Sequence, residues 1–77
     1  MSPTLLRTRN LRFVIYPHDH EPAHIHVYGP NAKAKFEIET LKCIYCSGFS
    51  IKALKEIRDF LSDKTFVLME AWYEWQE

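Results

Sequence analysis

The chain has 77 residues, of which 47% are hydrophobic and 14% are aromatic. This length and composition predict a single globular domain over residues 1–77 and exclude an intrinsically disordered chain. Ten Lys and Arg residues balance ten Asp and Glu residues, so the formal net charge is zero with neutral histidines. A zero net charge disfavours binding to nucleic acid or membranes through overall charge, although it leaves room for a local basic patch.

No segment of the sequence has the pattern of a membrane span or a signal peptide. The longest continuous apolar runs cover residues 13–16 and 66–69, whereas a membrane span needs about 20 apolar residues. Residues 1–7 contain two leucines but not the longer apolar region of a signal peptide. We therefore expect a cytoplasmic protein with no membrane partner.

The first half of the chain carries strand signals. Residues 11–16 are short, apolar and aromatic, and they are followed by Pro17. Residues 24–28 alternate, which places two aliphatic side chains on one face of a strand and three ring side chains on the other. After a Gly-Pro-Asn turn, residues 32–39 alternate again. These segments predict three strands that include a hairpin with one buried face, and residues 41–45 form a fourth short strand or a connector.

The second half of the chain carries helix signals. Apolar residues recur at positions 51, 54, 57 and 61, and Ser50 before them suits a helix N-cap. A second helix is expected from about Lys64, with Ser62 or Asp63 as its cap. The predicted fold class is therefore α+β: a three- or four-stranded antiparallel sheet followed by two C-terminal helices packed on one face.

All four histidines lie between positions 18 and 26. His24 and His26 are two residues apart, so on a strand they project from the same face. The two imidazoles could serve as the general acid and base of a catalytic site. Together with Asp19 and His20 they could instead hold a divalent metal ion such as zinc. The alternative without function is a set of half-exposed histidines on the open face of a sheet.

Two cysteines, Cys43 and Cys46, form a second candidate group. Their spacing suits half of a zinc site or a redox pair, and His24 and His26 would complete a zinc set of two sulfurs and two nitrogens. A redox pair normally begins a helix, but two residues separate Cys46 from the expected cap. We therefore favour two small residues at a turn, with free thiols as expected in the cytoplasm.

Five further residues are candidates for contact with a partner. Three basic residues precede the first acidic one, and two tryptophans lie in the last expected helix: Arg7, Arg9, Arg12, Trp72 and Trp75. Tryptophan is a frequent anchor at protein interfaces, and a basic strand edge can contact a partner or phosphates. The alternative is a solvated basic surface together with tryptophans that belong to the core.

The histidine segment and three shorter segments resemble a small bacterial and archaeal family, domain of unknown function 4160. The histidine segment reads Asp-His-Glu-Pro-Ala-His-Ile-His-Val over residues 19–27, and the others are residues 34–36, 48–50 and 70–72. The resemblance implies that Asp19, His20, His24 and His26 form the site. It also implies a gene that lies beside a second small gene, in an arrangement that looks like a toxin–antitoxin cassette.

Together these observations predict a small cytoplasmic module that binds a partner as a member of a toxin–antitoxin-like pair. The partner would be a small cognate protein or a second copy of the chain. The alternative is a small histidine-dependent nuclease or hydrolase, with or without a divalent metal. The sequence leaves open which of these two descriptions holds, and therefore whether the chain is an enzyme.

Overall fold

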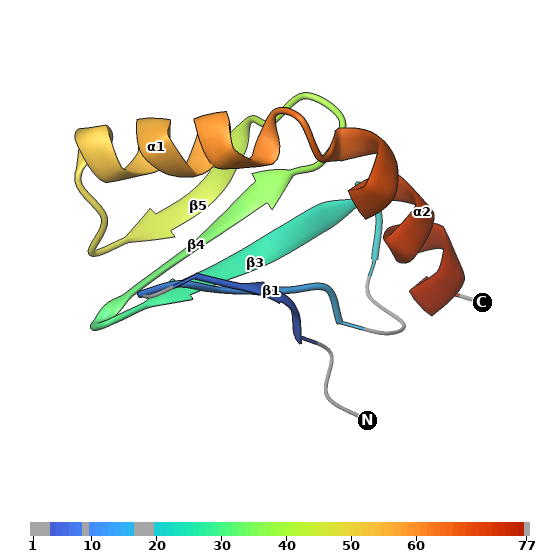
Figure 1. Cartoon of the computed structure of the whole chain (residues 1–77), viewed down its shortest axis with the longest axis horizontal. Helices are drawn as coiled ribbons and strands as arrows, with labels where there is room; N and C mark the ends of the chain where they lie inside the picture. Colours follow the sequence, from blue (N-terminus) through green and yellow to red (C-terminus); the bar gives the residue numbers. More distant parts are fainter. Residues whose placement is uncertain (1–3, 9, 17–19, 77) are drawn as a thin grey trace.

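The computed structural model describes residues 4–8, 10–16 and 20–76 (Figure 1). In these residues five strands form one antiparallel sheet in the order of the chain, and two helices follow. The elements are β1 (Thr4–Arg7), β2 (Arg12–Val14), β3 (His24–Gly29), β4 (Ala32–Glu37), β5 (Cys43–Ser47), α1 (Ile51–Leu61) and α2 (Thr65–Gln76). The predicted α+β class is confirmed, but the sheet has five strands rather than three or four.

The additional strand is β1, which pairs with β2 in antiparallel register. Leu6 lies opposite Phe13 and Arg7 opposite Arg12, with a shift in register between Thr4 and Leu6. β1 is too short to show an alternation of its own, so its strand conformation depends on this pairing. The segment at residues 41–45, for which the sequence allows a strand or a connector, contributes to a strand. This strand, β5, begins and ends two residues later than predicted.

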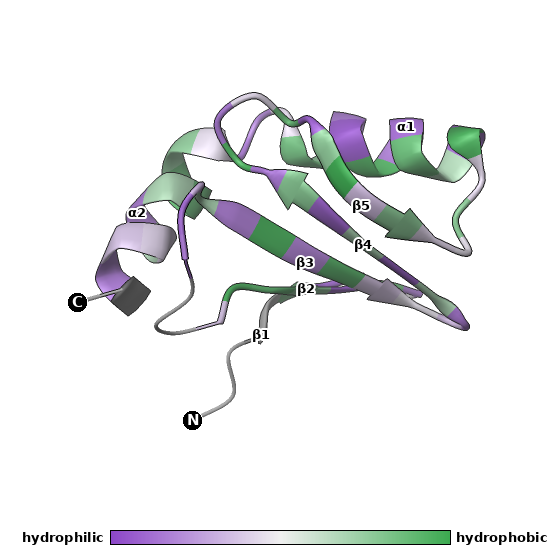
Figure 2. Ribbon diagram, turned by 180° about the vertical axis from the view of Figure 1, so that it is seen from behind, coloured by the Kyte–Doolittle hydropathy of each residue, from purple (hydrophilic) through white to green (hydrophobic). Residues whose placement is uncertain are grey.

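The alternating apolar residues of the strands point toward the helices and form the core with them. Figure 2 shows the alternation as successive green and purple bands along β3 and β4. The strand residues of this core are Phe13, Ile25, Val27, Ala34 and Phe36, and the helix residues are Ile57, Leu61, Leu68 and Trp72. Burial of this apolar surface is the main stabilising contribution to the fold.

The turn between β3 and β4 contains two residues, because Gly29 pairs with Ala32. Asn31 has a φ of 59°, in the left-handed region that Asn tolerates better than most residues. Pro30 before it has a ring that fixes φ near −65°. Proline followed by a residue of positive φ is the pattern of a type II turn.

The start of α1 follows the prediction. The amide of Ala53 donates a hydrogen bond of 3.0 Å to the Ser50 hydroxyl, which makes Ser50 the N-cap. Ile57 and Leu61 are the buried residues of this helix. α1 thereby lies across one face of the sheet (Figure 1).

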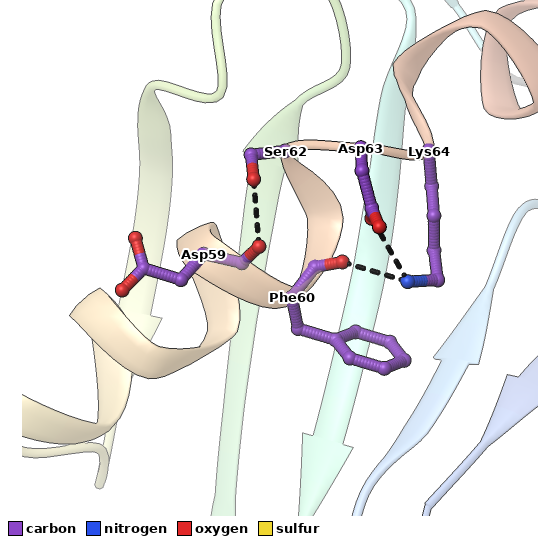
Figure 3. A network of polar contacts seen from close by, with 5 residues as sticks. All are labelled: Asp59, Phe60, Ser62, Asp63 and Lys64. Atoms are coloured by element: carbon purple, nitrogen blue, oxygen red, sulfur yellow. Dashed lines mark hydrogen bonds and ion pairs between the residues drawn. The ribbon is translucent and has the colours of Figure 1, made fainter.

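The predicted cap of α2 is wrong, because Ser62 ends α1 instead (Figure 3). The Ser62 hydroxyl donates a hydrogen bond of 2.7 Å to the carbonyl oxygen of Asp59. Lys64 then closes the turn, since its Nζ lies 3.0 Å from both the Phe60 carbonyl oxygen and a carboxylate oxygen of Asp63. These contacts fix the point at which the chain changes direction between the two helices.

α2 turns away from α1 and covers the end of the sheet at which β3 begins (Figure 1). Leu68 and Trp72 are its fully buried residues. Both helices contribute buried residues to the same core, but α1 lies along the sheet whereas α2 lies at its end (Figure 1). No helix in the described part of the chain is long and apolar enough to span a membrane.

Candidate functional site

The sheet face that α1 leaves uncovered carries aromatic and basic side chains in rows across the strands. One row runs from Arg12 through Tyr28 to Lys33. The next runs from Val14 through His26 and Lys35 to Tyr45. We refer to this surface as the open face, defined by Arg12, Tyr16, His26, Tyr28, Lys33, Lys35 and Tyr45.

His26 lies at the centre of the open face, between two tyrosines. Its ring meets the Tyr16 ring edge-on at a centroid distance of 4.7 Å. It lies nearly parallel to the Tyr28 ring, with 6.2 Å between the centroids. The two tyrosine hydroxyls share a hydrogen bond of 2.8 Å. The imidazole of His26 is therefore flanked by two aromatic rings that are hydrogen-bonded to each other.

Tyr28 keeps its hydroxyl proton at neutral pH. Burial and the hydrogen bond with Tyr16 raise the pKa of Tyr28 to about 12, although the guanidinium of Arg12 acts in the opposite direction. That guanidinium lies 5.2 Å from the centre of the Tyr28 ring. Tyr28 can therefore hydrogen-bond a ligand, but it is a poor candidate for a general base.

His24 is held differently from His26, because it is buried with 4% of its surface exposed. Its Nδ1 lies 2.8 Å from the Pro22 carbonyl oxygen. A carbonyl oxygen only accepts hydrogen bonds, so Nδ1 carries the proton and the lone pair of the neutral ring is on Nε2. The His24 ring also lies 5.2 Å from Trp72. His24 therefore sits at the junction of β3 and α2, rather than on the accessible surface.

The described histidines form a row. The ring centroids of His20 and His24 are 5.7 Å apart, and those of His24 and His26 are 5.1 Å apart. Nevertheless, no three His, Cys, Asp or Glu side chains within residues 4–8, 10–16 and 20–76 form a group that could hold a metal ion. The predicted divalent metal site is therefore not found among these histidines, and its fourth candidate, Asp19, lies outside the described residues.

The two cysteines are free thiols, as the sequence predicted. The Cys43 thiol donates a hydrogen bond of 3.3 Å to the Tyr45 carbonyl oxygen. Burial is the larger cause that raises the pKa of Cys43, and the nearby Cys46 raises it further. Cys46 is exposed, with its sulfur 3.7 Å from the Phe49 carbonyl oxygen. The described residues do not combine these sulfurs with histidines into a zinc set.

The five candidate partner-binding residues are distributed unevenly. Arg7 and Arg12 are exposed on neighbouring strands and lie directly opposite each other. Trp72 is 1% exposed, so its side chain belongs to the core and does not provide the expected surface anchor. Arg9 and the side chain of Trp75 lie outside the described residues.

The open face contains a groove that the sequence analysis missed. Its volume is about 340 Å³, and it is lined by His26, Tyr28, Lys33, Ala34, Lys35 and Tyr45. Alternation in residues 32–39 already places Lys33 and Lys35 on the same strand face as each other. Their position beside His26 and Tyr45 depends on strand order and register, which the sequence does not state directly.

Comparison with models of protein families places the chain in a family. The family model described as a domain of unknown function, DUF4160, matches residues 10–73. This match agrees with the family resemblance of the histidine segment. No curated protein matches the chain, and no solved structure matches it either.

Proposed function

The chain belongs to the DUF4160 family, a domain of unknown function, and on that premise we propose that it binds a small cognate protein in the cytoplasm, as one member of a toxin–antitoxin-like pair. The surface of the molecule supports this proposal. The observation that carries the proposal is the apolar outer surface of α2.

α2 is apolar on two sides. Leu68 and Trp72 pack into the core, whereas Phe66, Val67 and Tyr73 are 74%, 64% and 60% exposed. Large apolar side chains on a helix are normally buried against another element. Large exposed apolar patches on small proteins commonly mark a surface that another protein covers. The outer surface of α2 therefore fits a partner-binding surface.

The shape and charge around this surface indicate what kind of partner fits. An almost entirely apolar groove of about 280 Å³ lies beside Val67, between Leu6 and Ala71. The exposed Glu70 and Glu74 lie on the same helix. A partner that inserts an apolar side chain into the groove and surrounds it with basic residues would match both features.

Calorimetric titration of the purified chain with the protein encoded by the adjacent gene tests this proposal. We expect Phe66→Glu and Val67→Glu to weaken binding at least tenfold, because each places a charge where apolar contact is needed. Ile51→Glu is the matched control, since Ile51 is a large apolar residue on α1 that is even more exposed, at 87%. Binding that is unchanged in both α2 variants, or lost equally in the control, contradicts the proposal. Sedimentation of the chain alone tests the alternative in which the partner is a second copy.

A histidine-dependent nuclease is the second candidate, and the surroundings of His26 favour it. His26 and Lys35 line the same groove, so a proton-transferring group lies beside a cation that can bind a phosphate. Growth inhibition on expression should be lost in His26→Asn. Buried His24 would act by positioning, so His24→Asn should reduce the effect less. Unchanged toxicity in both variants would exclude this candidate.

A further inference from the structure

Part of the positive charge of this electrically neutral chain lies on one face of the sheet, apart from the basic residues of α1. Strand register places four cations on the face of the sheet opposite α1: Arg7, Arg12, Lys33 and Lys35. Glu37 is the carboxylate that the same register puts on this face of β4, and it accepts a hydrogen bond from the Thr40 hydroxyl. Glu37 does not line the groove. The open face is therefore positive where the groove lies.

Aromatic rings accompany these cations. The ammonium of Lys33 lies 5.9 Å from the centre of the Tyr45 ring, and the Arg12 guanidinium lies over Tyr28. Tyr45 lines the groove and is 44% exposed. Rings on an antiparallel sheet provide surfaces on which unpaired bases stack, and nearby cations neutralise the phosphates between those bases.

We propose that the open face binds single-stranded RNA. One base stacks on Tyr45 in the groove, and the phosphates on either side meet Lys33, Lys35 and Arg12. The strand must be unpaired, because a base in a duplex does not offer its face to a side chain. The polar groups of His26 and Tyr28 in the groove wall suit the ribose 2′-hydroxyl, which is both a donor and an acceptor and separates RNA from DNA.

RNA binding goes beyond the partner-binding proposal and does not depend on it, since the groove is lined by residues of the sheet and not by the exposed residues of α2. For the nuclease candidate it names the class of substrate. Binding of RNA without cleavage would leave the present inference intact and remove the nuclease candidate. RNA binding and nuclease activity can therefore be tested separately.

Fluorescence anisotropy of a labelled oligouridine RNA, titrated with the full chain, tests the inference. Affinity should fall between about 50 and 200 mM salt, with a log–log slope near −2 if three phosphates are neutralised. Tyr45→Ala should weaken binding by about fivefold or more, whereas Tyr45→Phe should retain it because stacking needs the ring and not the hydroxyl.

A double charge reversal tests the location of the site. Lys33→Glu with Lys35→Glu should weaken binding more than tenfold. Lys52→Glu with Lys55→Glu on α1 makes the same change of charge on exposed residues outside the open face, and it should retain most of the affinity. Equal losses in the two double variants would overturn the proposed location.

Two competitors test the chemical class of the ligand. Oligodeoxyuridine of the same length that binds as tightly as the RNA would overturn the assignment to RNA. Duplex RNA that competes equally would overturn the requirement for unpaired bases, and absence of RNA binding by the unmodified chain at low salt would overturn the inference as a whole. Phe66→Glu should bind RNA normally, which separates this site from the partner-binding surface.

Discussion

The imidazole of His24 lies 5.2 Å from the indole of Trp72, so the first residue of β3 is in contact with the core side of α2. The same helix presents Phe66 and Tyr73 on its outer side. α2 thus separates the candidate partner-binding surface from the row of histidines. A partner that shifts α2 would move Trp72, which packs against His24, and would thereby change the packing between His24 and His26.

Replacement of Trp72 by alanine should destabilise the fold severely. A buried tryptophan that is reduced to alanine leaves a cavity and typically costs about 3–5 kcal/mol in the free energy of unfolding. The measurement is urea denaturation followed by circular dichroism. Tyr73→Ala is the control, because its exposed side chain contributes little packing. Equal stability of the two variants would contradict the core position of Trp72.

Alkaline pH should destabilise the chain through Tyr28. Its pKa is raised from 10.0 to about 12 in the folded state, so the unfolded chain releases this proton first as pH increases. The associated stability is complete below pH 10 and is lost as pH rises toward 12. Urea midpoints at pH 9 and pH 11 should differ less in Tyr28→Phe than in the unmodified chain. An equal decrease in both would show that Tyr28 is not responsible.

The two thiols should react at different rates. The pKa of Cys43 is raised by burial and by its neighbour Cys46, so less of it is thiolate at a given pH, and it is also less exposed than Cys46. Iodoacetamide near pH 8 should therefore modify Cys46 first. Peptide mass spectrometry after partial labelling measures the order. Faster labelling of Cys43 would contradict the described environment of the two sulfurs.

Removal of the α1 cap should have a moderate effect. Ser50→Ala deletes the hydroxyl that accepts a hydrogen bond from the Ala53 amide, and such a loss costs about 1 kcal/mol in unfolding free energy. Ser50→Asp should retain most of the stability, because a carboxylate accepts the same bond. Thermal unfolding of the three proteins provides the comparison, and an aspartate variant as unstable as the alanine one would argue against capping.

The parts of the fold that were predicted from sequence are those with a clear period. Alternation identified β3 and β4, and helical spacing after Ser50 identified α1. β1 is too short to show a period and becomes a strand only by pairing with β2. In α2, apolar residues occur on both sides of the helix, so no period distinguishes buried Trp72 from exposed Phe66.

The candidate site was predictable only within one strand. The spacing of His24 and His26 placed both on one face of β3. Spacing alone could not indicate that α2 buries the first and leaves the second half-exposed. The groove was missed for a related reason, since Lys35 and Tyr45 come together through the register of β4 and β5.

Each strand of the sheet pairs with the strand next to it in the chain, and this simple order has a kinetic consequence. Short connections cost little entropy to close, and folds dominated by contacts between neighbouring segments cross their folding barrier quickly. The hairpin of β3 and β4 has a two-residue turn, so its closure costs the least chain entropy and we expect it to form first. The other strands can then pair with its two edges in succession: β2 followed by β1 on one edge, and β5 on the other.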